Sequence, residues 1–329
     1  MEVEIRPLRT LEEIEACVEL QRRIWGSDDL DVVPAHVLIT AAHNGGVLLG
    51  AFAGGQLVGF VFGFLGTDER RGREAPATVK LKHCSHQLGV LPEWQDKGIG
   101  YQLKLAQREA VRNQGLRLIT WTYDPLESRN AYFNIAKLGA VCNTYIRNAY
   151  GELHDALNRG LPTDRFQVDW YIASRRVATR LSQGHFALSR SSFEQAGAVL
   201  VNPCRFDERG LPIPPETFQT PDVGFWLVEI PYRFQEIKRQ DPGLARERQM
   251  CIRDSAGAVR NRLRPRLPGG GFRPRTGAGE ALPQLLRPGP GPSDRKGAME
   301  RLRPGSCGPS GCGVIAHAAP PISGSCRLR

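Results

Sequence analysis

The feature that most constrains the fold of this chain is a run of twenty residues, 47–66, in which Gln56 is the only strongly polar side chain. A run of this length can cross a membrane as a helix, and three of its glycines stand at the four-residue spacing of packed membrane helices. The alternative is a β-hairpin with strands over 47–53 and 57–64, since Gly54 and Gly55 supply the positive φ of a tight turn. Turn-forming glycines in the middle of the run favour the hairpin, so we predict two buried strands.

The residues on either side of this hairpin alternate between helical and extended patterns. The first helix begins after Thr10, whose spacing from Glu13 is that of a capping box, and it ends at Gly26. The other expected elements are strands over 3–8, 79–91, 116–123, 141–147 and 167–173 and helices over 34–43, 99–113 and 128–138. Strands that alternate with helices in this way predict an α/β (α+β) fold.

A short loop, Pro92–Gly100, connects the long strand to the helix that follows it. The unpaired N–H groups and the dipole at a helix N-terminus attract an anion, and Gly98 and Gly100 have no Cβ atoms to keep a phosphate away. Lys97 adds a positive charge. A plain tight turn is the alternative, because a G-x-G pattern alone is a weak signal.

In this context the segment Gln95-Asp96-Lys97-Gly98-Ile99-Gly100 resembles the acyl-CoA pyrophosphate loop, Q/R-x-x-G-x-G/A, of the GNAT superfamily of N-acetyltransferases. The resemblance spans residues 1–174 and implies a mixed central sheet flanked by helices, with acetyl-CoA as the acyl donor and no metal. It further implies that Leu88, Gly89 and Val90 lie along the pantetheine arm, that Gln95, Asp96, Lys97, Gly98, Ile99 and Gly100 present N–H groups to the pyrophosphate, and that Asn130, Phe133 and Lys137 lie on the helix beside the cofactor.

The chemistry that the resemblance implies is direct attack of an amine on the thioester in a ternary complex, with a backbone N–H near Val90 stabilising the charge on oxygen. An acid then has to protonate the leaving sulfur. Ile135 stands where many family members have a tyrosine acid. Tyr132, one helical turn earlier, is the candidate that is left, and ordinary packing is the alternative for it.

For the base, the candidates are two histidines near the start of the long strand. By alternation His83 and His86 fall on opposite faces, with His86 on the face of Leu88 and Val90. An imidazole titrates near neutral pH, which suits a general base, so we expect His86 to take this role. A hydrogen-bonded structural histidine is the alternative for both positions.

The sequence does not identify the acceptor amine, which is a small molecule or a peptide. Trp25, with the loop 158–166 and the run 124–126, is similar to a bacterial GNAT subgroup of undefined substrate. Within this loop Arg159 and Arg165 are candidates to bind a carboxylate of the substrate. The alternative is a solvated loop in which Asp164 and Arg165 form an ion pair.

Beyond the acyltransferase domain, residues 175–248 have mixed helical and extended character, which we interpret as a truncated C-terminal α+β subdomain. Residues 249–255 resemble the translation of a transposon mosaic-end adapter used in DNA library preparation. We therefore expect 249–329 to be a non-native, disordered tail rich in Gly, Pro and Arg.

The net charge of +10 belongs to this tail, since 13 of the 44 Lys and Arg residues but only 3 of the 34 Asp and Glu residues lie in 256–329. The preceding residues are electrically balanced. With the tail excluded we expect no nucleic-acid partner. The alternative is a genuine Arg-rich tail that binds nucleic acid.

Four cysteines precede the tail, at positions 17, 84, 142 and 204, and they form no CxxC pair, so we expect neither a metal site nor a disulfide. The N-terminus lacks the pattern of a signal peptide, and we expect a cytoplasmic protein without a membrane partner. The oligomeric state stays open. Because Ile135 replaces the tyrosine, a catalytically silent acyl-CoA-binding regulatory module is the second hypothesis for function.

Overall fold

The computed structural model describes residues 2–26, 31–72, 74–153, 155, 157–183, 189–217, 221, 223, 225–262 and 312–318. These residues fall into two units, one formed by residues 2–183 and the other by the described residues from 189 onward. The division lies beyond the boundary at 174 that the sequence suggested, because the helix α6 (Arg175–Gln183) packs on the first unit. Arg176 Nε of α6 donates to the carbonyl of Gly139 at 3.1 Å.

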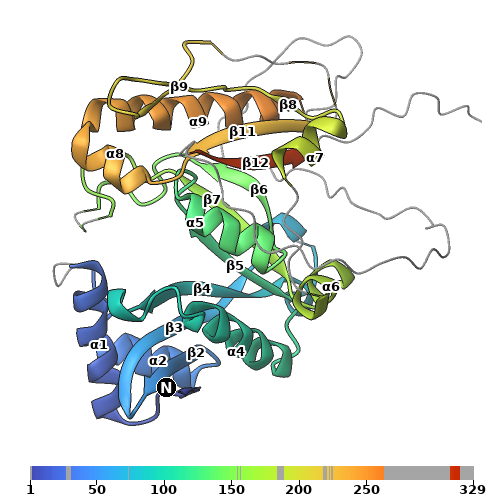
Figure 1. The fold of residues 1–329 in the computed structure, drawn as a ribbon. Coiled ribbons are helices and arrows are strands. Elements are labelled where there is room, and N and C mark those ends of the chain that lie inside the picture. Colours follow the sequence, from blue (N-terminus) through green and yellow to red (C-terminus); the bar gives the residue numbers. More distant parts are fainter. Residues whose placement is uncertain are drawn as a thin grey trace, which may run out of the picture. The chain divides into compact units, whose positions relative to one another are not determined.

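A seven-stranded sheet is the centre of the first unit (Figure 1). The strand order is β1 (Val3–Pro7), β2 (Val47–Ala53), β3 (Gln56–Thr67), β4 (Leu81–Val90), β5 (Leu118–Tyr123), β7 (Arg165–Tyr171) and β6 (Val141–Ile146). β4 and β5 are parallel, and every other neighbouring pair of this sheet is antiparallel. The prediction of a mixed central sheet flanked by helices is therefore confirmed.

The apolar run at 47–66 forms the hairpin β2–β3, as predicted. β2 is buried along its whole length and pairs with β3, with the turn at Gly54 and Gly55. Both glycines have positive φ, 57° and 83°. Within the described part of the chain, no helix is long and apolar enough to cross a membrane.

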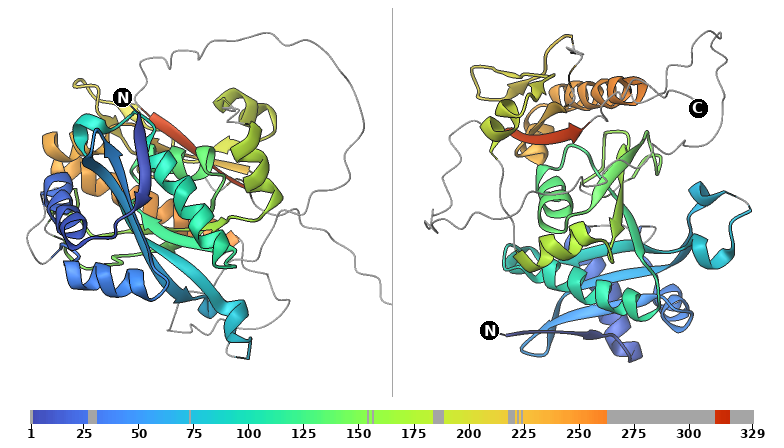
Figure 2. Two further views of the ribbon diagram at one scale, coloured as in Figure 1. Left: turned by 90° about the horizontal axis from the view of Figure 1, so that it is seen from below. Right: turned by 90° about the vertical axis from the view of Figure 1, so that its right-hand side faces the viewer.

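Helices cover both faces of this sheet (Figure 2, left). On one face lie α1 (Leu11–Trp25), which begins with the predicted capping box of Thr10, and α2 (Ala35–His43). On the other lies α4 (Ile99–Asn113). Alternation along β3 accounts for this, since the ring of Phe60 packs edge-to-face against Trp25 of α1 with centroids 5.8 Å apart. A methyl group on neighbouring Gly59 would instead point to Ile99 of α4.

Short helical segments complete the first unit. They are η1 (Glu69–Arg71), α3 (Ala77–Lys80), η2 (Pro92–Trp94), α5 (Ser128–Ala131) and the π-helical turn η3 (Tyr132–Lys137). Two expectations need correction here. The long strand begins at Leu81, because residues 77–80 form α3, and the helix expected over 128–138 is divided into α5 and η3.

The second unit is built around β11 (Phe225–Pro231), which pairs in parallel with β8 (Val199–Leu200) and antiparallel with β12 (Cys312–Ala318). β9 (Arg205–Phe206) and β10 (Pro212–Ile213) form a separate two-stranded pair. The helices of this unit are α7 (Arg190–Gln195), α8 (Phe234–Gln240) and α9 (Pro242–Arg262). Of these elements, α9 continues past residue 248 and β12 lies wholly beyond it.

Helix α9 passes the position where the adapter-like residues begin. Cys251 and Ile252 are buried within it, and β12 lies further along the expected tail; the rest of 263–329 lies outside the described residues. Arg248 is 1 % exposed, and among the described residues its guanidinium has no hydrogen-bond partner. A buried, unpaired cation is a local mismatch between sequence and fold, and it lies at the junction singled out in the sequence.

Candidate functional site

The loop between β4 and α4 has the backbone of an anion cradle. Gly98 is the N-cap of α4 with φ 80° and ψ 3°, and Asp96 also has a positive φ, 60°. The side chain of Gln95 closes the loop, because its Nε2 donates to the carbonyl of Val90 at 3.1 Å. Two left-handed residues separated by one residue turn successive N–H groups toward the same side.

Those N–H groups are available for a ligand. Within the described residues, none of the backbone N–H groups of 96–100 donates a hydrogen bond, and the first donor of the helix is Tyr101, which bonds to Gly98. A Cβ added to Gly98 would have no protein atom within 4 Å. Five unused donors at the N-terminus of a fifteen-residue helix fit a phosphate or pyrophosphate.

Charged side chains surround the cradle. Lys97 Nζ lies 4.4 Å from the ring centroid of Trp94, which holds the ammonium beside the loop. Arg129 of α5 forms an ion pair with Asp96 at 2.6 Å. The sequence did not indicate Arg129, because it lies thirty-three positions from Asp96 in a short helix and only the fold brings it to the loop.

β4 and β5 separate beside this loop. Their parallel pairing is limited to His83–Ile119 and Cys84–Thr120. Beyond that point, Leu88, Gly89 and Val90 pair with β3 along one edge of β4. The other edge of β4 has no pairing with β5 there. A strand edge that no neighbouring strand covers fits a ligand that itself contains amides, as pantetheine does.

The three predicted pantetheine contacts differ in their surroundings. Leu88 lies on the side of α4, 3.5 Å from the position of a methyl group on Gly100. Gly89 faces α1 so closely that a methyl group would lie 2.7 Å from Ile24 Cδ1. Val90 is buried, and its carbonyl is taken by Gln95. The side chain of Ile99 is 2 % exposed, so only its N–H is available to an anion.

The residues predicted to flank the cofactor lie on α5 and η3. Asn130 and Lys137 are exposed and Phe133 is half-buried. Tyr132 is 48 % exposed, with Lys137 Nζ 5.7 Å from its ring centroid. The sequence analysis placed Tyr132 one turn of α-helix before Ile135. Because a π-helical turn begins at Tyr132, the residues of this segment do not keep the spacing of an ideal α-helix.

His83 and His86 point to opposite faces, as predicted, but His86 does not share the face of Leu88. Phe62 pairs with Gln87 and Gly63 with Ser85, so His86 is the extra residue of a β-bulge, which shifts the alternation by one position. The ring of His86 packs against Phe62 and Phe64, with centroids 5.9 and 5.8 Å away.

His86 forms part of a groove of about 530 Å³ beside α2. The groove is mostly apolar, and its lining residues are Val33, His36, Val37, Thr40, Ala41, Asn44, Phe62, Phe64 and His86. Burial lowers the pKa of His86, so the ring is neutral at pH 7 and can accept a proton. The sequence did not indicate this groove, because its lining residues belong to separate elements that only the fold brings together.

The buried polar cluster on the opposite face is centred on Lys104 of α4. Its Nζ donates to Ser85 Oγ at 2.7 Å and to Gln107 Oε1 at 3.0 Å, and it lies 3.9 Å from the ring centroid of Trp121. Gln107 Nε2 lies 3.2 Å from His83 Nε2. Burial, together with the charge of Lys104, lowers the pKa of His83 to about 4. His83 is thus a neutral structural histidine.

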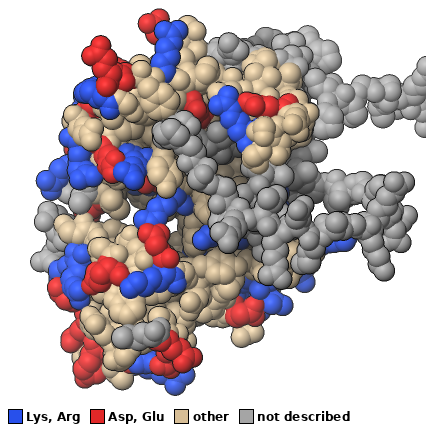
Figure 3. Space-filling model, viewed as in Figure 1, with Lys and Arg blue, Asp and Glu red and all other residues tan. Residues whose placement is uncertain are grey.

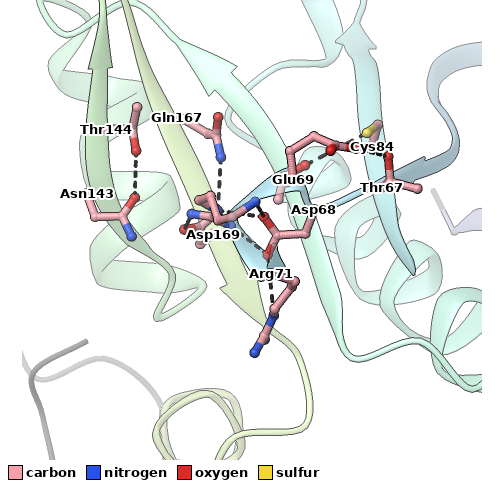
Figure 4. Close-up of polar contacts among 11 residues, drawn as sticks. Thr67, Asp68, Glu69, Arg71, Cys84, Asn143, Thr144, Gln167 and Asp169 are labelled. Atoms are coloured by element: carbon pink, nitrogen blue, oxygen red, sulfur yellow. Dashed lines mark hydrogen bonds and ion pairs between the residues drawn. The ribbon is translucent and has the colours of Figure 1, made fainter. Parts of the chain in front are cut away.

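A second polar cluster anchors the loop after β3 (Figure 4). Arg70 of η1 donates to Asp68 at 2.7 Å and to both carboxylate oxygens of Asp169 on β7, at 2.6 and 3.1 Å. Burial opposes ionisation of Asp68, but the hydrogen bonds and charge of Arg70 hold its pKa below the usual value. Asp169 is completely buried, so this cluster ties the β3–β4 loop to the sheet.

The predicted substrate residues differ in exposure and in their contacts. Trp25 is half-buried at the end of α1, beside Gly89. Arg159 is exposed, whereas Arg165 is 8 % exposed and donates to the carbonyl of Asp164 and to Asn158 Oδ1. Arg165 therefore braces its own loop, and its contact with Asp164 is a backbone hydrogen bond rather than the expected ion pair.

Two further observations concern surface charge and metal-binding side chains. Figure 3 shows basic and acidic side chains interspersed over the face in view. Among the described residues, no group of three or more His, Cys, Asp or Glu side chains is placed to hold a metal ion. The cysteines at 17, 84, 142, 204 and 251 are free thiols.

Comparison with known proteins gives a match to one family. Residues 14–136 match the model of the acetyltransferase (GNAT) family. Searching the curated proteins gives no match. Among solved structures, the chain is similar to the ribosomal-protein-S18-alanine N-acetyltransferase from Escherichia coli, with 12 % identity over 53 % of this chain and 96 % of the other, at a TM-score of 0.39. It is also similar to the PaiA N-acetyltransferase from Thermoplasma acidophilum in complex with coenzyme A, with 18 % identity over 52 % and 99 %, at a TM-score of 0.36.

Proposed function

We propose that this protein is an acetyl-CoA-dependent N-acyltransferase, because residues 14–136 match the model of the acetyltransferase (GNAT) family. In this proposal an amine attacks the thioester directly in a ternary complex. The observation that carries it is the cradle of free N–H groups at 96–100, which stands beside the unpaired edge of β4.

The residues of the cradle have distinct proposed roles. The N–H groups of 96–100 bind the pyrophosphate, and Lys97 and Arg129 add positive charge to it. When the anion binds, Arg129 exchanges Asp96 for a phosphate oxygen. The backbone of Leu88, Gly89 and Val90 binds the pantetheine arm, with Asn130, Phe133 and Lys137 beside it on α5 and η3.

The acceptor amine enters from the face that carries the groove beside α2. His86 lies in that groove with a neutral ring, so it can remove a proton from the incoming ammonium. Trp25 and Arg159 are kept as proposed contacts of the acceptor, whose identity, small molecule or peptide, stays open. The free thiols support our expectation of a reducing, cytoplasmic setting.

Release of CoA thiol from acetyl-CoA in the presence of a panel of amines and peptides tests this function. We expect amine-dependent thiol release by the full chain. Saturable binding of acetyl-CoA without turnover on any amine would favour the silent regulatory module instead.

A further inference from the structure

The ammonium group of Lys104 is buried. Its side chain lies in α4 and the residue is only 3 % exposed. Among the described residues no carboxylate pairs with it, and its contacts are the neutral groups of Ser85, Gln107 and Trp121. Burial alone lowers its pKa to about 7. A packed protein rarely keeps an uncompensated charge where an apolar side chain would be more stable, unless the charge has a use.

Lys104 lies at the point where β4 and β5 separate. The last pair between these strands is Cys84–Thr120. Ser85 and Trp121 are the next residue on each strand, and Lys104 contacts both of them. The ammonium therefore lies where the gap between β4 and β5 begins. The edge of β4 that β5 does not cover is one side of this gap.

Neutral groups hold the ammonium in place without cancelling its charge. Ser85 and Gln107 each accept a hydrogen bond from the ammonium, and Gln107 also contacts His83, which is neutral. Ser85, Gln107 and His83 thus fix the position of the ammonium but carry no negative charge. A preorganised cation of this kind stabilises a negative charge that develops in front of it.

We propose that Lys104 stabilises the sulfur that leaves the acyl donor and returns a proton to it. This inference rests on the proposed function, in which the thioester end of the pantetheine arm lies in the gap between β4 and β5. It assigns the acid role to Lys104 rather than to Tyr132, which is exposed on η3.

The acceptor nitrogen forms a bond to the acetyl carbon while the carbon–sulfur bond breaks, and the electron pair of that bond goes to sulfur. Lys104 gives one proton to the sulfur. The acceptor nitrogen loses two protons to water through His86, one when the ammonium becomes the attacking amine and a second when the amide forms. Lys104 regains one proton from water after the products leave. Both side chains return to their starting states.

The direct readout is the pKa of the CoA thiol when CoA is bound, followed by the ultraviolet absorbance of the thiolate. We expect the wild-type full chain to lower the thiol pKa of bound CoA by about one unit relative to free CoA, a tenfold change in ionisation. In Lys104→Met this shift disappears. Lys80→Met, which removes a lysine from α3, keeps it.

Three results distinguish the inference from the function beneath it. Saturable CoA binding with an unshifted thiol in the wild-type protein overturns the inference alone, and so does a shift that persists in Lys104→Met. Absence of CoA binding by the wild-type protein overturns the proposed function and the inference together.

A measurement on the wild-type protein covers the case in which the Met variant does not fold. By linkage, the CoA thiolate has to raise the pKa of Lys104 by the same factor that Lys104 lowers the pKa of the thiol. The Nζ resonance of Lys104 in protein labelled with nitrogen-15 lysine reports this. A Lys104 titration that CoA leaves unchanged contradicts the role.

Discussion

The guanidinium of Arg70 donates to both carboxylate oxygens of Asp169, although the two residues are ninety-nine positions apart in sequence. Asp169 is completely buried, and Asp68 accepts from the same guanidinium. One cation thus balances two carboxylates and fixes the loop after β3 to β7.

Replacing Arg70 should therefore cost stability. Arg70→Met leaves Asp68 and Asp169 without their shared cation, and we expect a loss of about 3 kcal/mol in the free energy of unfolding. Arg71→Met is the matched control, because Arg71 is more exposed and lies 3.6 Å from Asp68. Its loss should stay below about 1 kcal/mol in urea unfolding. Equal losses for the two variants would contradict the anchoring role.

Lys104→Met should have the opposite effect on stability. The variant removes a buried cation and leaves the hydrogen bond from Ser85 to Gln107 in place. We expect a gain of about 1–4 kcal/mol at pH 7. Thermal or urea unfolding measures it, and a more stable but slower enzyme would result.

The stability of the wild-type protein should also depend on the titration of Lys104. Between its folded pKa of about 7 and the ordinary 10.5, the unfolded chain binds the extra proton, so stability rises with pH through this window. Lys104→Met lacks this rise. A rise of the same size in both proteins would show that another group causes it.

His83 should make the protein sensitive to acid. Its pKa falls from 6.5 to about 4 on folding, so the unfolded chain binds more protons in this range. The stability contributed by neutral His83 is complete above pH 6.5 and is lost as the pH falls toward 4, by roughly 3 kcal/mol at most. His86 adds to the same trend, so the comparison is with His83→Gln, whose unfolding free energy should fall less steeply.

The rate of acetyl transfer tests His86 as the base. In the wild-type enzyme kcat/KM should fall at acidic pH as His86 is protonated, below the usual histidine range because burial lowers its pKa. His86→Ala should lose this limb and about 10²-fold or more in rate. His36→Ala, in the same groove, is the control. An unchanged pH–rate profile for His86→Ala removes it from the mechanism.

The local signals in the sequence predicted most of the first unit. The capping box of Thr10 and Glu13 and the glycines at 54 and 55 act through neighbouring residues, and each appears where expected. The same holds for the loop ending at Gly98, since a helix N-terminus is a local structure. The free N–H groups of this cradle followed from its pattern.

What the sequence did not reveal depends on tertiary structure. The bulge at His86 is a property of two strands together, so alternation within one strand placed His86 on the wrong face. Lys104 and Gln107 lie on the buried side of α4. From sequence alone, a charged or amide side chain in a helix is predicted to be solvent-exposed. Arg129 reaches Asp96, and Arg70 reaches Asp169, only through the packing of distant segments.

Binding of acetyl-CoA to the cradle is best measured by calorimetric titration of the full chain. Gly98→Glu places a carboxylate where the phosphates bind. Gly115→Glu is the matched control, because Gly115 has nearly the same φ, 78° against 80°, and equally open surroundings, but it follows the other end of α4. We expect saturable binding by the wild-type protein and by Gly115→Glu and none by Gly98→Glu. Binding that survives in Gly98→Glu, or none by the folded wild-type protein, would contradict the assignment of the loop.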